Sequence, residues 1–148
     1  MELAQKLITE ETVVFWFRRD LRLEDNAGLY HALRSNSKVL PIFIFDSVIL
    51  ERLEDNKDRR VDFIHQTLKL LKENLEKRGS SLLILYGDPV KIFKQLGPKA
   101  VYTNHDYEPY ALKRDLEVKN ILVSKQIDFF PFKDQVIFEW EEINLFRN

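Results

Sequence analysis

The sequence predicts an α/β fold: a Rossmann-like, doubly wound sheet of five parallel strands in the order 3-2-1-4-5, with helices on both faces. Three observations predict it. Short apolar runs alternate with longer segments of helical periodicity, a pattern typical of repeated βαβ units. The apolar runs are rich in β-branched and aromatic residues and lack polar alternation, as strands covered on both faces do. Charged residues follow several of these runs, and in an open parallel sheet those ends meet at one edge, where ligands bind.

The first two strands are predicted at residues 13–17 and 39–45. A helix begins between them, because Asp25 or Asn26 can accept a backbone N–H bond as an N-cap. Pro41 lies inside the second strand and lacks the N–H that a central ladder needs. We therefore expect local irregularity, or the entry of the strand, at that position.

The longest helix is predicted at residues 60–78, after an exposed loop at 53–60. Its apolar side chains recur at intervals of three and four residues, which places them on one face of a helix. Gly79 ends this helix, because a residue without a Cβ adopts a positive φ at no steric cost. The apolar positions are Val61, Ile64, Leu68, Leu71 and Leu75.

The second half of the chain continues the alternation. Asp88 is predicted to cap a short helix that has Pro89 at its first position, where the missing N–H costs nothing. The strands of this half are predicted at residues 82–86, 100–103 and 128–132, and its helices at 89–96 and 110–124.

Composition narrows the class of protein. A chain of 148 residues, 45% of them hydrophobic, is expected to form one domain with its own core. Lysine and arginine number 23 and aspartate and glutamate 24, so the net charge of −1 supplies no overall field that attracts DNA. No apolar run approaches the roughly 20 residues that a membrane helix needs, and the N-terminus lacks the apolar core of a signal peptide. We expect a cytoplasmic protein with no membrane partner.

The residue types that the sequence lacks, and the spacing of its histidines, exclude several kinds of site. There is no cysteine, so disulfides, thiolate nucleophiles and cysteine metal sites are excluded. The loop at 18–26 contains no glycine and cannot give a pyrophosphate the close backbone approach of a classical dinucleotide site. His31, His65 and His105 lie on separate segments without the spacing of metal ligands. The sequence predicts no catalytic and no metal-binding residue.

Residues 16–26, Trp-Phe-Arg-Arg-Asp-Leu-Arg-Leu-Glu-Asp-Asn, resemble the opening signature of the DNA photolyase and cryptochrome family. Shorter matches follow in family order at residues 43–46, 79–82, 87–89, 104–109 and 114–115. The resemblance implies that residues 12–135 are the N-terminal α/β domain of that family. Residues 1–11 would then be an N-terminal extension, and residues 136–148 the start of a linker to a helical FAD-binding domain that this chain lacks.

The resemblance also implies a ligand. In this family the α/β domain binds an antenna chromophore, a deazaflavin or methenyltetrahydrofolate, which passes excitation energy to FAD in the helical domain. Carried onto this sequence, it places five residues around the chromophore: Phe17, Arg18, Phe45, Asp106 and Glu108. The remaining charged residues of the motifs, Arg22, Glu24, Asp25, Asn26, Asn104 and Arg114, are interpreted as structural, and Trp140 as part of the interface with the helical domain.

The implied function is that of a deoxyribodipyrimidine photolyase, a lyase that uses light to repair pyrimidine dimers in DNA. Its partners would be its own helical FAD domain and damaged DNA, and the 148 residues alone are expected to be inactive. Two alternatives stay open. One is a cryptochrome, a blue-light photoreceptor without repair, and the other is a free-standing adenine-nucleotide-binding α/β domain.

Overall fold

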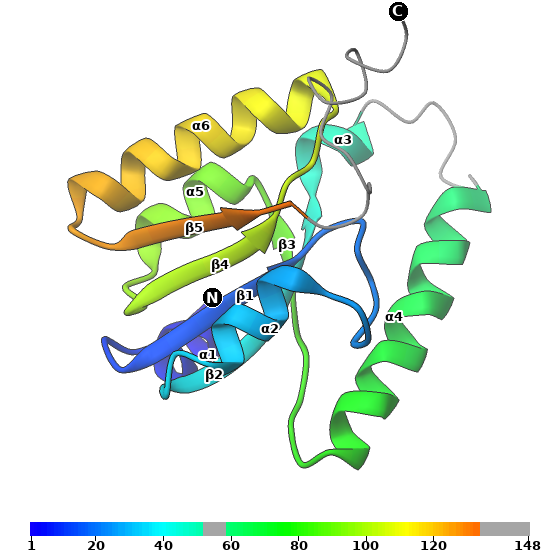
Figure 1. Ribbon diagram of the computed structural model, residues 1–148. Coiled ribbons are helices and arrows are strands. Elements are labelled where there is room, and N and C mark those ends of the chain that lie inside the picture. Colours follow the sequence, from blue (N-terminus) through cyan, green and yellow to red (C-terminus); the bar gives the residue numbers. More distant parts are fainter. Residues whose placement is uncertain (52–58, 134–148) are drawn as a thin grey trace, which may run out of the picture.

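A computed structural model describes residues 1–51 and 59–133 and contains one sheet of five strands (Figure 1). The strands are β1 (Thr12–Phe17), β2 (Lys38–Asp46), β3 (Leu83–Gly87), β4 (Ala100–Asn104) and β5 (Asp128–Phe132). Every neighbouring pair is parallel, and the order is β3-β2-β1-β4-β5. The predicted fold class and strand order are confirmed.

Helices cover both faces of this sheet. They are α1 (Glu2–Leu7), α2 (Ala27–Leu33), α3 (Ser47–Glu51), α4 (Arg59–Lys77), α5 (Pro89–Gln95) and α6 (Pro109–Ser124). Side chains of α1, α5 and α6 share one core cluster with Val14 and Trp16 of β1. Those of α2 and α4 share the other cluster with Phe15 and Phe17. Side chains alternate along a strand, so β1 supplies both cores.

The predicted capping residues mark the starts of α2 and α5 and the end of α4. The Asn26 side chain caps α2 by accepting a bond from the Leu29 N–H at 3.0 Å. Asp88 caps α5 in the same way, accepting from the Val90 N–H at 3.0 Å. Gly79 follows α4 with a φ of +78°, in the left-handed region.

Pro41 lies within β2, opposite Phe15 of β1. The register between β2 and β3 begins only at Ile42, so Pro41 has a strand neighbour on the β1 side alone. A residue without an N–H is tolerated there because one side of the strand carries no ladder.

Two short helices, α1 and α3, were not predicted from the sequence. The predicted extension at residues 1–11 contains α1, and Ala4 and Ile8 are buried in the core beside α5 and α6. The other helix, α3, follows β2 without a break. Helices of six and five residues give too few turns for an apolar period to show. Trp140 and the predicted linker at 136–148 lie outside the described residues, as does most of the predicted loop at 53–60.

Candidate functional site

A cavity of about 190 Å³ lies at the carboxyl ends of β1 and β2, beside the start of α6. This is the edge where ligands bind in open α/β sheets. Its charged lining consists of Arg18, Arg19, Asp46, Asp106, Glu108 and Arg114, and Tyr110 also lines it. Its apolar lining includes Trp16, Phe43, Ile44, Phe45, Ile49 and Leu50. Apolar walls with a few placed charges are the usual composition of a small-molecule site.

The cavity brings together four of the five residues that the sequence places around a chromophore: Arg18, Phe45, Asp106 and Glu108. Phe17 does not line it. The Phe17 side chain is completely buried and packs edge-to-face on Phe15, with ring centroids 4.7 Å apart. Side chains alternate along β1, so Phe17 points to the opposite face of the sheet from Trp16, which lines the cavity. In the structure Phe17 is thus part of a core cluster and not of the cavity lining.

Phe45 forms a rigid part of the cavity wall. Its ring stacks on Tyr86 of β3 at a centroid distance of 4.7 Å and on His65 of α4 at 4.8 Å. Aromatic neighbours on two elements restrict the ring of Phe45. A flat ligand would therefore meet a wall of fixed position.

Arg18 is a buried cation that joins three elements. It donates to the backbone carbonyl of Asn104 and to the Asp115 carboxylate on α6, and its guanidinium carbon lies 4.8 Å from the centre of the Trp16 ring. Burial lowers the pKa of Arg18, and the Asp115 carboxylate opposes that shift. The contacts fix Arg18 at the end of β1.

Arg114 is the second buried arginine, and its side chain is 6% exposed. Its guanidinium lies 3.5 Å from Asp46 and 3.2 Å from Asp115, measured from nitrogen to carboxylate oxygen. The remaining nitrogen, Nη2, has no hydrogen-bond partner among the described residues; its nearest recorded carboxylate oxygen, Oδ2 of Asp106, is 3.9 Å away. Buried polar groups are nearly always bonded, so this donor requires an explanation.

Tyr110 connects the start of α6 to the end of β2. Its hydroxyl donates to Asp46 Oδ2 at 2.7 Å, while Asp46 Oδ1 accepts from the Val48 N–H at 3.0 Å. Burial raises the pKa of Tyr110, and the bond to Asp46 raises it further. Sequence analysis missed Tyr110, although it lies one helical turn from Arg114 and two residues after Glu108.

A buried network around Asn104 holds the loop that carries Arg18. The Asn104 amide donates to Asp20 at 2.5 Å and to Asn26 at 2.8 Å, and its oxygen accepts from the Gly28 N–H at 2.8 Å. Asp20 in turn accepts from the backbone N–H of Arg18 at 2.8 Å. One β4 side chain therefore ties this loop and the start of α2 to the sheet.

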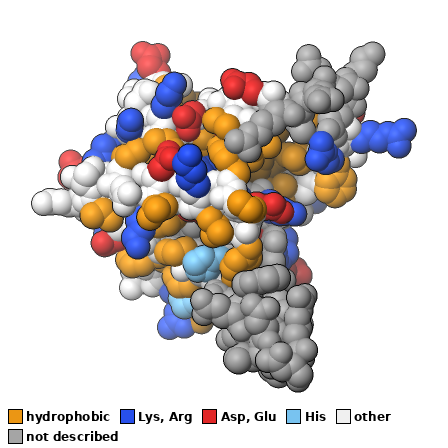
Figure 2. All heavy atoms as spheres, turned by 90° about the horizontal axis from the view of Figure 1, so that it is seen from above, with side chains coloured by type: hydrophobic (Ala, Val, Ile, Leu, Met, Phe, Trp, Pro, Cys, Tyr) orange, Lys and Arg blue, Asp and Glu red, His pale blue; other side chains and the backbone are white. Residues whose placement is uncertain are grey.

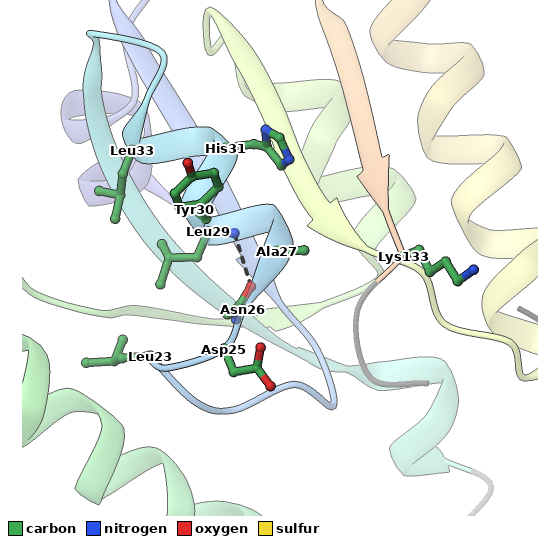
Figure 3. A pocket seen from close by; sticks show the side chains of 9 residues that line it. All are labelled: Leu23, Asp25, Asn26, Ala27, Leu29, Tyr30, His31, Leu33 and Lys133. Atoms are coloured by element: carbon green, nitrogen blue, oxygen red, sulfur yellow. Dashed lines mark hydrogen bonds between the residues drawn. The ribbon is translucent and has the colours of Figure 1, made fainter. Parts of the chain in front are cut away.

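A second hollow lies over α2 (Figure 3). Its volume of about 540 Å³ is larger than that of the cavity at the strand ends, but it is a shallow surface feature. Tyr30 and Leu33, which line it, are 54% and 61% exposed, and the sheet edge contributes Lys133. The charged side chains that line this hollow, Asp25 and Lys133, are not buried. The cavity at the strand ends is therefore the stronger candidate site.

Other kinds of site find no support in residues 1–51 and 59–133. They contain no group of three histidine or carboxylate side chains that could hold a metal ion. They also contain no helix long and apolar enough to cross a bilayer. On the face in Figure 2, acidic and basic side chains are interspersed with hydrophobic ones, so that face offers no broad basic surface for a polyanion.

Comparison with known proteins gives consistent matches. The family model for DNA photolyase matches residues 13–147. A deoxyribodipyrimidine photo-lyase of Synechococcus sp. is 36% identical over 135 residues, which cover 88% of this chain and 28% of that protein. Cryptochrome DASH of Synechocystis sp. is 30% identical over 122 residues, which cover 77% of this chain and 24% of that protein.

A solved structure matches as well. An archaeal photolyase from Sulfolobus tokodaii, whose structure with two FAD molecules is described as implying a novel light-harvesting cofactor, superposes with a TM-score of 0.78 at 33% identity. The superposition covers 93% of this chain and 32% of that protein. The chain thus spans about a third or less of the length of these relatives.

Proposed function

The chain belongs to the DNA photolyase family, and from this premise we propose that it holds the antenna chromophore of a light-driven DNA-repair flavoprotein. The activity proposed for the whole protein is that of a deoxyribodipyrimidine photolyase. The observation that carries the proposal is the cavity at the strand ends, where Phe45 and two buried arginines enclose a space suited to a flat ring.

The size of the cavity supports a shared site. Pockets for small molecules usually measure about 300–1,000 Å³, and this one measures about 190 Å³. We propose that the described residues enclose part of a chromophore and that a helical FAD domain covers the rest. A bound chromophore would absorb light and pass the excitation to FAD. The residues of this chain would fix the orientation of the ring, on which such transfer depends, and keep water from its buried edge.

A flavin or deazaflavin ring is the chromophore that we propose. The Sulfolobus tokodaii photolyase, whose two FAD molecules are described as implying a novel light-harvesting cofactor, supports a flavin-type antenna over a folate. The DNA partner is proposed for the whole protein, since a net charge of −1 gives this chain no overall attraction for DNA. Repair also requires the compartment that holds the DNA, so the proposal keeps the cytoplasmic location expected from the sequence.

The cryptochrome alternative is supported by similarity to cryptochromes, among them the 30% identity to Cryptochrome DASH. A cryptochrome would use the same α/β domain and the same cavity for light capture. The two functions differ in repair, so an activity assay separates them. The free-standing nucleotide-binding domain is not carried forward, because the family model covers residues 13–147.

Two measurements test the proposal. The protein purified from its own host should show, besides flavin absorption, a second chromophore band whose excitation feeds flavin fluorescence. The same preparation should remove dimers from a thymine-dimer oligonucleotide in blue light and leave them intact in the dark. Two pigments without repair would favour the cryptochrome. The absence of any second pigment, together with no binding of flavin, deazaflavin or folate to the purified chain, would refute the antenna role.

A further inference from the structure

α6 has two apolar faces, and the described residues cover only one of them. The covered face packs into the core through Ala111, Val118 and Leu122. The outer face carries the α6 stripe, three large aliphatic side chains that are 51%, 59% and 58% exposed: Leu112, Leu116 and Val123. We infer that the α6 stripe is a contact surface for a second copy of this chain, which binds with its own α6 antiparallel to the first.

The spacing of the α6 stripe places its side chains in one row. Residues four and seven positions apart lie on the same side of a helix, and Leu112 and Val123 are separated by about 16 Å along the axis. Single exposed apolar residues are normal on a protein surface, but a helix that is apolar on two faces is usually covered on both. In Figure 1, α6 runs along the outer edge of the structure, beside α5. A partner can therefore reach the row along its length.

Two opposite charges accompany the α6 stripe. Lys119 is exposed and lies within the row. Asp115 precedes Lys119 by one helical turn, so both lie on one edge of the row. The Asp115 side chain is 18% exposed, although its oxygens also contact Arg18 and Arg114. The outer face of α6 therefore presents both a cation and an anion beside its apolar side chains.

A two-fold axis at the midpoint of the α6 stripe matches these charges. In an antiparallel pair about such an axis, each edge of the row meets the same edge of the second copy. Leu112 then faces Val123 of the second copy, and Leu116 faces the aliphatic stem of Lys119. Lys119 stands one residue, about 1.5 Å, from the level of Asp115 of the second copy. Each copy thus offers the other an apolar row and a charge of the required sign.

This self-complementarity favours a second copy over a partner of one charge sign. An acidic surface would meet the Asp115 carboxylate and a basic surface would meet Lys119, and each like-charged contact carries a cost. A two-fold contact avoids both costs, because it uses the same patch on each copy. α6 has 16 residues, and a contact confined to one helix is smaller than the about 1,600 Å² of a standard interface. We therefore expect a weak dimer that forms at micromolar concentrations or above.

Sedimentation velocity of the unmodified chain tests the inference. From about 5 to about 500 µM, the average mass should rise from that of one chain toward that of two, as expected for a weak interface. In Leu116→Lys the mass should stay that of one chain, because an ammonium replaces the central aliphatic side chain and faces Lys119 of the second copy. Leu70→Lys, the same change at a position of α4 that is 62% exposed, should associate as the unmodified chain does.

A charge substitution gives a second test. Lys119→Asp brings two carboxylates together at Asp115 and should weaken association about tenfold, whereas Lys72→Asp, the same change on α4, should not. Circular dichroism checks that each variant keeps its helices, as substitutions at exposed positions should. The inference would be overturned by the mass of one chain at every concentration, by association that survives Leu116→Lys, or by equal association of Lys119→Asp and the unmodified chain. The antenna role stands in each case, because it does not involve the α6 stripe.

Discussion

Replacing Asn104 by alanine should destabilise the chain more than any polar substitution on its surface. The side chain is 3% exposed and makes three hydrogen bonds, to Asp20, Asn26 and Gly28. Asn26 keeps its bond from the Leu29 N–H, so its loss is small. Asp20 loses a donor to a buried carboxylate, at about 1.5–3 kcal/mol, and the Gly28 N–H loses its acceptor, at about 1–2 kcal/mol. The total is about 2.5–5 kcal/mol, against about 5–15 kcal/mol for the unfolding free energy of a whole domain.

Urea unfolding followed by far-ultraviolet circular dichroism measures this loss. The midpoint should fall while the slope of free energy against urea stays constant, because the surface exposed on unfolding is unchanged. Asn120→Ala makes the same chemical change at an exposed position of α6 and should alter stability by less than about 0.5 kcal/mol. A loss below about 1 kcal/mol for Asn104→Ala would refute the argument that this network holds the loop.

Three further predictions concern packing, ionisation and the division between core and cavity. Gly28→Ala should lower stability by about 1–3 kcal/mol in thermal unfolding, because a Cβ would lie 2.8–2.9 Å from neighbouring side chains; Gly97→Ala, which meets open space, should cost nothing, and equal effects would contradict this. In the native chain the Tyr110 hydroxyl should stay protonated above pH 10. The difference in absorbance at 295 nm between the unmodified chain and Tyr110→Phe should therefore appear at a higher pH than the ionisation of a free tyrosine. Since the folded pKa is the raised one, the stability contributed by Tyr110 is complete below about pH 10 and falls as pH rises toward the folded value; ionisation at the free value would refute this. Phe17→Leu should lower the urea midpoint without changing riboflavin affinity, and Phe45→Leu should weaken binding; the reverse pattern would show that the assignment of the two rings is wrong.

The strands and the long helices were predictable because each carries a repeated signal. The five strands and α4 agree with the sequence to within one residue at almost every boundary, since apolar runs and the three-and-four spacing sample many residues. α1 was not predictable in the same way. Its contribution to the core rests on Ala4 and Ile8 alone, and two apolar residues define no period.

The candidate site was predictable as a place and less so as a set of side chains. Topology alone brings the ends of β1, β2 and β4 to one edge. Phe17 lies on the opposite face of β1 from Trp16, which lines the cavity, and is buried in the other core cluster. Phe45 lies on the same face as Phe17 and nevertheless lines the cavity, since it stands at the end of β2, where Ile64 and Leu50 meet the opening. That distinction depends on the packing of α3 and α4, which sequence periodicity does not specify.

The contacts of Arg114 could not be predicted from its sequence motif alone. An arginine followed directly by an aspartate is most simply a structural ion pair, and the contact at 3.2 Å to Asp115 exists. The pair uses one edge of the guanidinium, while another edge remains unbonded beside the cavity. The Asn104 network, by contrast, bonds every polar group of its side chain. The two polar clusters therefore differ: the Asn104 cluster has its side-chain polar groups bonded and holds the scaffold, whereas the Arg114 cluster leaves one buried guanidinium nitrogen without a hydrogen-bond partner among the described residues.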